Sequence, residues 1–306
     1  MSFQVTGLSV LMLVALCIPG FLLVKSRLLK AEYVTGFSVV LLYVCAPALS
    51  LYSFQQAECS RQMLINIGIV ILAATVFQLV IMAVSYAFFR KTFIEPQSRV
   101  ATVASAFGNV GFFGVPLLQA ILPQYPEAVI YSAVFIVSMN VLGWTLGMSV
   151  MSGDKKHASL RRILVNPTTV ILLVALPLFF TNTRLPVQLM EFVTFFAKMS
   201  APLAMLILGM RMATVSFKEV FSDYRQFIAI IMKLVVFPLL VFLVLQPIPM
   251  DAGLKISLFI LSGMPPAAVT LNYAELTRTA PKTAANIIIL GSLACVLTLP
   301  LLLLLA

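Results

Sequence analysis

The sequence predicts an all-α membrane protein that crosses the bilayer many times. Of its 306 residues, 61% are hydrophobic and 10% are charged, and the mean hydropathy is +1.09. Apolar stretches of about 20 residues recur along the whole chain, which is the length that a helix needs to cross a bilayer. The polar connections between them are short, so the composition excludes an ordinary soluble domain.

Ten spans are expected, and their positions follow from the apolar stretches. They lie at 5–24, 34–53, 64–89, 98–121, 127–151, 167–183, 191–213, 225–245, 252–276 and 281–305. Basic residues follow the first span and none precedes it, so we interpret that span as a retained helix and not as a cleaved signal peptide. The four cysteines lack the spacing of metal ligands, so neither a metal nor a cofactor is predicted.

The distribution of basic residues predicts the orientation of the spans. The net charge of +10 is also typical of nucleic-acid binders, but here the basic residues lie in short loops, as the positive-inside rule describes. Outward loops hold only Arg61, Arg184 and Lys255, while Lys198 and Lys233 fall within spans. We therefore expect no nucleic-acid partner, and a multi-pass protein of a prokaryotic cytoplasmic (inner) membrane with both termini outside. The remaining fifteen basic residues would face the cytoplasm: Lys25, Arg27, Lys30, Arg90, Lys91, Arg99, Lys155, Lys156, Arg161, Arg162, Arg211, Lys218, Arg225, Arg278 and Lys282.

The longest polar connection divides the chain into two halves of five spans each. Residues 1–153 form the first half, 154–166 a cytoplasmic linker and 167–306 the second half. Because each half holds an odd number of spans, the two halves must have opposite orientations, which defines an inverted repeat. A shift of 155 residues aligns three residue pairs: Pro47 with Pro202, Gly108 with Gly263, and Pro126 with Pro281.

Spans four and nine contain residues that interrupt helices. Span four carries AFGNVGFFGVPLL (106–118) and span nine carries LSGMPPAAVTLN (261–272). A glycine weakens a helix by about 1 kcal/mol relative to alanine, and an interior proline costs about 3 kcal/mol. In a bilayer such breaks are tolerated where the backbone is buried in protein or lines a wet cavity, and the alternative is a kink that only serves packing. The predicted structural breaks are Gly114, Pro116, Pro47 and Pro202.

The two breaks are predicted to form an anion site in the middle of the membrane. Gly108 and Gly263 lie roughly 15–16 Å into their spans, half of a hydrocarbon core about 30 Å thick. We expect Gly263 to end the first half of span nine and Pro265 or Pro266 to begin the second. Two half-helix N-termini would then direct free N–H groups at one place, which suits a carboxylate. Asn109 either orients that ligand or replaces lost backbone hydrogen bonds.

Charged residues near or within the spans provide further candidates. Lys233 lies about 12 Å from the inner end of span eight, where a lysine is costly unless it snorkels, pairs or faces water. It either neutralises an anionic substrate or has a structural role. Lys198 is closer to the surface and is expected to snorkel. Glu275 is expected to pair with Arg278 at the cytoplasmic surface, with proton coupling as the alternative.

The motifs resemble those of the auxin efflux carrier family. The resemblance rests on the GNxGxxGxP run (108–116), the proline break of span nine, and the pair YVCAPALS (43–50) and KMSAPLAMLILG (198–209). That family includes plant auxin exporters and bacterial malonate or malate carriers, and its fold is related to that of the bile acid:sodium symporters. The resemblance implies ten helices as two inverted repeats with spans four and nine crossed at their breaks. It also implies a scaffold of spans one, two, six and seven, with spans three to five and eight to ten as an elevator-type transport domain.

By motif position, the resemblance implies substrate contacts at Asn109 and at the Pro265–Pro266 break. Met264 stands where span four has Asn109, so a polar partner there is not implied, and the long cytoplasmic loop of the plant exporters is absent. The complete predicted substrate-binding set is Gly108, Asn109, Gly111, Lys233, Gly263, Met264, Pro265 and Pro266.

The predicted function is secondary active transport of a small organic carboxylate of the malonate, malate or auxin type. The alternatives are a sodium-coupled carrier of larger anions such as bile acids, and a non-transporting membrane sensor or scaffold. Proton or sodium coupling and a homodimer are left open. The chain has no HExxH, GxSxG or P-loop motif, so no enzyme activity is predicted.

Overall fold

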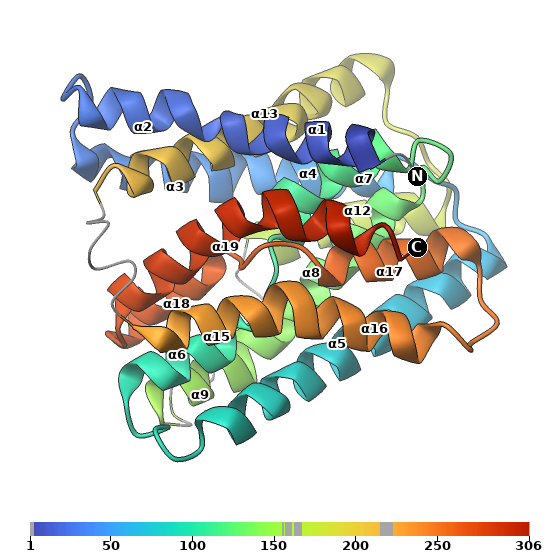
Figure 1. The fold of residues 1–306 in the computed structure, drawn as a ribbon. Helices are drawn as coiled ribbons and strands as arrows, with labels where there is room; N and C mark the ends of the chain where they lie inside the picture. The colour runs from blue at the N-terminus through green and yellow to red at the C-terminus, as the bar shows by residue number, and fades with distance from the viewer. Residues whose placement is uncertain (1–2, 155, 157–160, 162–166, 215–222, 306) are drawn as a thin grey trace.

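The protein is a bundle of long helices that run side by side (Figure 1). The computed structural model describes residues 3–154, 156, 161, 167–214 and 223–305. Both chain ends lie at the same end of the bundle (Figure 1). Most of the predicted linker 154–166 falls outside the described residues, as do the basic residues Lys155, Arg162 and Lys218. The described part of the chain contains no strand, only one isolated antiparallel bridge.

Seven helical segments within the described residues are long and apolar enough to cross a membrane. They coincide with predicted spans one, two, three, five, seven, eight and ten, and they make the chain a polytopic α-helical membrane protein. Predicted spans four, six and nine fall on shorter helices, so the count of ten stays a prediction. The seven segments are Gly7–Lys25, Ala31–Phe54, Arg61–Phe89, Ala128–Ser152, Val187–Met212, Tyr224–Leu245 and Pro281–Leu302.

Helices α1 to α9 make up the first half of the chain, and helices α11 to α19 make up the second. In the first half these are α1 (Phe3–Ala15), α2 (Cys17–Lys25), α3 (Val34–Val40), α4 (Ala46–Phe54), α5 (Arg61–Phe89), α6 (Pro96–Ala104), α7 (Val115–Ile121), α8 (Ala128–Leu142) and α9 (Met148–Ser152). In the second half they are α11 (Pro167–Val170), α12 (Leu172–Phe180), α13 (Val187–Met212), α15 (Tyr224–Ile231), α16 (Phe237–Leu245), α17 (Ala252–Ser262), α18 (Val269–Thr277) and α19 (Pro281–Leu302). Short helical turns join some of them: η1 (Ala31–Tyr33), η2 (Leu41–Cys45), η3 (Val110–Gly114), η4 (Gly143–Gly147) and η6 (Met232–Val236).

Side-chain caps fix where several of the long helices begin. The Ser60 hydroxyl accepts a hydrogen bond from the Met63 N–H at 3.1 Å at the start of α5. The Asp251 carboxylate accepts one from the Leu254 N–H at 2.8 Å at the start of α17. Such caps satisfy N–H groups that have no partner within the first helical turn. Polar residues at the ends of apolar runs therefore define the ends of these helices.

The prolines predicted to break spans two and seven, and the Gly114–Pro116 part of span four, do not interrupt their helices. Pro47 lies two residues after η2, and Pro116 lies two residues after η3. A proline lacks an N–H and crowds the carbonyl four residues before it, and the wider π-helical turn relieves both problems. In η3, for example, the Gly114 N–H donates to the Asn109 carbonyl at 3.1 Å. Pro202 lies inside α13, which continues through it to Met212.

Packing divides most of the helices into two groups. The first group consists of α2, α3, α4, α11, α12 and α13, in which α13 packs on α2, α3 and α4, and α4 packs on α11 and α12. The second consists of α5 to α9 and α15 to α19, linked by pairs such as α5 with α8, α6 with α19, and α9 with α18. Helix α1 joins the two groups, because it packs on α19 and α7 as well as on α2 and α13, and α4 of the first group also packs on α8 of the second.

The closest backbone approach in the first group lies between α2 and α13. A Cβ atom added at Gly209 would lie 1.8 Å from the Cys17 carbonyl oxygen, and one added at Gly20 would lie 2.0 Å from the Leu206 carbonyl oxygen. No side chain fits at either distance. Small residues that let two backbones touch are the usual means of packing helices inside a membrane, and here they hold the two helices together.

Candidate functional site

Two interrupted helices meet at their breaks inside the bundle. Helix α6 ends at Ala104 and helical structure resumes with η3, while α17 ends at Ser262 and α18 follows after a gap. The Asn109 N–H donates to the Pro265 carbonyl at 2.7 Å, and the Ala267 N–H donates to the Phe107 carbonyl at 2.9 Å. These bonds satisfy backbone groups that the breaks release from their helices, which a bilayer interior requires. We call the paired segments 105–109 and 263–268 the crossover.

The crossover differs in one respect from the predicted helix starts. Gly263 does cap the end of α17, and its N–H donates to the Ile260 carbonyl at 3.0 Å. Pro265 and Pro266, however, do not begin α18, which starts at Val269. A proline forces the residue before it into an extended conformation, so Pro266 keeps Pro265 extended. The two prolines therefore form an extended segment of the crossover, in which Pro266 lies opposite Gly108.

Lys233 is buried behind the crossover. It is fully buried, its ammonium donates to the Ser262 carbonyl, and it lies 4.6 Å from the centre of the Phe237 ring. No salt bridge found among the described residues includes it. A positive charge beside the last carbonyls of α17 complements the negative end of that helix. The side chain of Lys233 is not part of the cavity lining described next.

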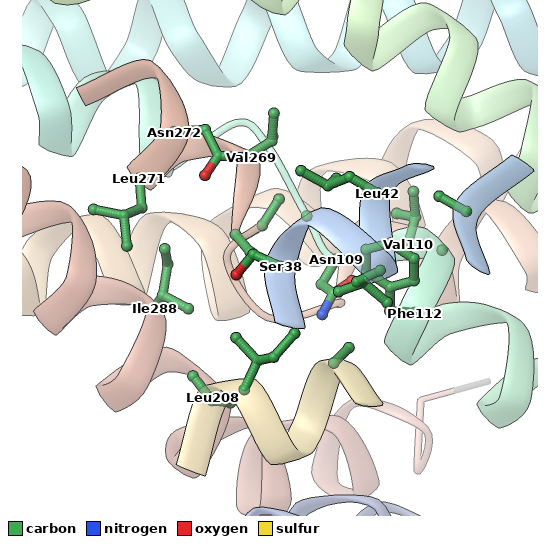
Figure 2. A pocket seen from close by; sticks show the side chains of 18 of the residues that line it. Ser38, Leu42, Asn109, Val110, Phe112, Leu208, Val269, Leu271, Asn272 and Ile288 are labelled. Atoms are coloured by element: carbon green, nitrogen blue, oxygen red, sulfur yellow. The ribbon is translucent and has the colours of Figure 1, made fainter. Parts of the chain in front are cut away.

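A cavity of about 160 Å³ lies between the two groups of helices, beside the crossover. The first group contributes α3, η2, α4 and α13, and the second contributes 108–112, α8, 267–272 and α19. Figure 2 shows Ser38, Asn109 and Asn272 approaching this space from three separate segments. Most of the lining is apolar, and the polar lining residues are Ser38, Ser50, Asn109, Asn140, Arg211, Asn272 and Ser292.

Hydrogen-bond donors and acceptors without protein partners converge on this cavity. The side-chain amides of Asn109, Asn140 and Asn272 form no hydrogen bond with any residue that the structure describes, so each is available to a ligand. Two helical segments also begin at the cavity wall, one at Val110 and the other at Val269. The N-terminal end of a helix carries a partial positive charge. The cavity therefore offers neutral donors to an anion in a mostly apolar surround.

The predicted site residues are divided between the cavity and the crossover behind it. Gly108, Asn109 and Gly111 line the cavity, whereas Gly263, Met264, Pro265, Pro266 and Lys233 are absent from its described lining. Asn272 and Asn140 were not predicted as site residues. Asn272 lies in the motif of span nine, and Asn140 is an amide within an otherwise apolar span, so both carried a signal. Arg211 carried none, because it looked like one more basic residue of a cytoplasmic loop.

Glu275 has a different partner from the one predicted. Its carboxylate lies 3.7 Å from the Arg211 guanidinium rather than pairing with Arg278. The reason is local, because Arg278 lies beyond the end of α18 in a left-handed backbone conformation with φ of 53°. The Arg211–Glu275 pair connects α13 of the first helix group to α18 of the second.

A second cavity of about 100 Å³ lies farther along the same boundary. Its lining includes Lys198 and Gln119, and it shares Leu49, Gly111 and Phe112 with the first cavity. Lys198 is exposed, in keeping with its predicted position near a span end. The three shared residues form the wall between the two cavities.

Comparison with known proteins agrees with this architecture. A family model described as "Membrane transport protein" matches residues 7–161 and again residues 154–303, and the two matches meet inside the predicted linker. The chain is therefore a multi-pass membrane protein of a transport family. The chain belongs to the auxin efflux carrier family, which is a family of membrane transporters. A comparison with curated proteins finds no match.

Proposed function

We propose that this protein is a secondary active transporter that moves a small organic carboxylate across the cell membrane. The observation that carries this function is the cavity at the crossover, where two helix N-termini converge with three amides that have no partner among the described residues. The N-terminal ends of helices suit anions, and in transporters with broken helices they bind substrate carboxylates. The asparagine amides add hydrogen-bond donors that carry no charge. They bind a carboxylate without forming an ion pair, so the ligand can leave.

The volume of the cavity favours a short acid. An engineered cavity of about 150 Å³ holds one benzene molecule, so a cavity of about 160 Å³ suits a molecule of similar size. Acids of the malonate or malate type meet this limit, whereas a bile acid exceeds it several times. The mostly apolar lining suits the carbon chain between the carboxyl groups.

We also propose the ten-span inverted repeat with an elevator-type movement. Both chain ends lie at the same end of the bundle (Figure 1), which an even number of crossings requires. The first helix group corresponds to spans one, two, six and seven apart from α1, and would be the scaffold. The second corresponds to spans three to five and eight to ten, and would be the transport domain. Because the cavity lies between the groups, sliding of one group on the other would carry the site across the membrane.

Orientation and coupling complete the proposed function. Placement in the inner membrane with both termini outside follows from the basic loops. Among the described residues, no group of three or more His, Cys, Asp or Glu side chains could hold a metal ion. We therefore propose that the gradient, whether of protons or sodium, acts through backbone carbonyls, amides or single carboxylates.

Transport by the purified protein in liposomes tests this function. Labelled malonate and malate should accumulate inside proteoliposomes when a proton or sodium gradient is imposed, and liposomes without protein should not accumulate them. Uptake that saturates and is blocked by unlabelled malonate would support the proposed site. If no carboxylate is bound or transported under either gradient, the proposed function is wrong and a sensor or scaffold becomes the better reading.

A further inference from the structure

We propose that Arg211 is a second anchor for the substrate and selects acids with two carboxylates over acids with one. This role rests on the proposed function and assigns the substrate class of that same site. Arg211 lies in the last turn of α13 and lines the cavity. Among the described lining residues it is the one Lys, Arg or His, so it supplies the full positive charge that the other donors lack.

One face of α13 places Arg211 at the end of the cavity wall. Ala204, Leu208 and Arg211 all line the cavity and recur at intervals of three and four residues, as residues on one helix face do. Ala204 and Arg211 are seven positions apart, which corresponds to about 10 Å along the helix. Because Asn109 of the crossover and Arg211 of α13 line the same cavity, a ligand that fills it would meet both.

The pairing of Arg211 with Glu275 is loose enough to be exchanged. The two charged groups are 3.7 Å apart, and the side chains of Arg211 and Glu275 are 27% and 52% exposed. A strong bidentate pair would have contacts of about 2.7–2.9 Å, and exposed pairs are weak because water competes with them. Glu275 thus contacts the guanidinium without a tight pair, and a substrate carboxylate would take its place.

The exchange also links occupancy of the site to the two helix groups. Arg211 belongs to α13 of the first group and Glu275 belongs to α18 of the second. A substrate carboxylate on Arg211 would therefore break a charged contact between the groups while it forms one of its own. Lys233 is unsuited to this role because its side chain is buried and its ammonium donates to the Ser262 carbonyl.

Binding of two ligands that differ by one charge tests this role. Malonate and its monoamide, malonamate, have nearly the same size, and both would be titrated calorimetrically into the purified protein in detergent. The wild type should bind malonate about tenfold or more tightly than malonamate, because only malonate offers a second carboxylate to a charge-assisted contact. In Arg211→Gln the affinity for malonate should fall to about that of malonamate, while malonamate affinity should change less than about twofold.

Two further variants separate substrate binding from a structural ion pair. Glu275→Gln removes the competing carboxylate, so malonate affinity should rise severalfold, opposite in direction to Arg211→Gln. The matched control is Arg184→Gln, because Arg184 also pairs with a glutamate, Glu58 at 4.0 Å, but does not line the cavity. Malonate affinity should be unchanged in that control. If Arg211→Gln fails to fold, Arg211→Lys keeps the charge and should retain part of the preference for malonate.

Several results would overturn the role of Arg211. One is equal loss of malonate and malonamate affinity in Arg211→Gln; another is loss of neither. A third is a fall in malonate affinity in Glu275→Gln as large as in Arg211→Gln, which a purely structural pair would produce. Wild-type protein that transports malonate and malonamate equally well would refute the role of Arg211 and leave the proposed function standing. Wild-type protein that binds no carboxylate would refute both.

Discussion

The ammonium group of Lys233 lies directly against Gly108 at the point where the two interrupted helices cross. A Cβ atom added at Gly108 would lie 3.0 Å from the Nζ and 3.0 Å from the Cε of Lys233. The lysine cannot simply move away, because its ammonium donates to the Ser262 carbonyl. The buried Lys233 side chain thus occupies the space that a side chain at position 108 would need, so the two positions depend on each other.

This contact predicts that Gly108→Ala destabilises the protein. The added methyl group would push the lysine off the Ser262 carbonyl, at a cost of about 1–3 kcal/mol in the free energy of unfolding. In a Lys233→Ala background the same substitution should cost less than about 0.5 kcal/mol, because the two residues are energetically coupled. Thermal unfolding in detergent measures both. The control is Gly36→Ala, since a Cβ atom there would meet nothing within 4 Å; additive costs at positions 108 and 233 would contradict the coupling.

Lys233→Gln should affect stability more than substrate affinity. The lysine bonds to the crossover but does not line the cavity, so we expect a loss of about 1–3 kcal/mol of stability from the unmade hydrogen bond. The affinity for malonate should change less than about threefold, since no substrate contact is lost. Calorimetric titration alongside thermal unfolding separates the two effects. A large loss of affinity with unchanged stability would instead make Lys233 a substrate ligand.

Asn109→Ala should have the opposite profile. The Asn109 side chain makes no hydrogen bond with the described residues, and its backbone N–H, which holds the crossover, is retained in alanine. We expect malonate affinity to fall about tenfold or more, the effect of losing one or two hydrogen bonds to a charged group, at unchanged unfolding temperature. Asn66→Ala is the contrasting control, because the Asn66 amide donates to the Tyr131 hydroxyl at 2.8 Å away from the cavity. That variant should lose stability and keep its affinity; wild-type affinity in Asn109→Ala would remove Asn109 from the site.

Gly209→Ala should be among the most damaging single substitutions in the chain. Its methyl group would lie 1.8 Å from the Cys17 carbonyl oxygen, and backbone cannot give way as a side chain can, so α2 and α13 would have to separate. We expect a loss of about 3 kcal/mol or more, at the upper end of overpacking effects. Size-exclusion elution and unfolding temperature report it. Gly68→Ala in α5 should behave as wild type, since nothing lies within 4 Å of its added methyl group.

The sequence was sufficient to predict the long helices and the crossover segments. Unbroken apolar runs with polar ends, such as the stretch that starts after Ser60, predicted the seven long helices. The cluster of glycine, asparagine and proline residues marked the break of span four near Gly108. What a proline does within such a run was predicted less well, because Pro47 and Pro116 are accommodated by π-helical turns and Pro202 by a continuous helix. Local propensity alone does not tell a break from an adjustment in hydrogen bonding.

The candidate site could be predicted only in part. Asn109 belongs to a motif, so its place in the cavity lining could be inferred. Arg211 lies far from that motif in the chain, and only the packing of α13 on the crossover side of the bundle brings it to the same cavity. For the same reason Glu275 was assigned to its sequence neighbour Arg278, while the actual contact joins residues 64 positions apart.

The wall between the two cavities has a consequence for the membrane itself. Only Leu49, Gly111 and Phe112 belong to both linings, and glycine adds no bulk, so the side chains of Leu49 and Phe112 are the ones that contact both cavities. In the proposed transport function, these two side chains would have to keep ions from passing between the two cavities. Trimming Phe112 to alanine would open a passive leak, visible as dissipation of an imposed gradient without any carboxylate present.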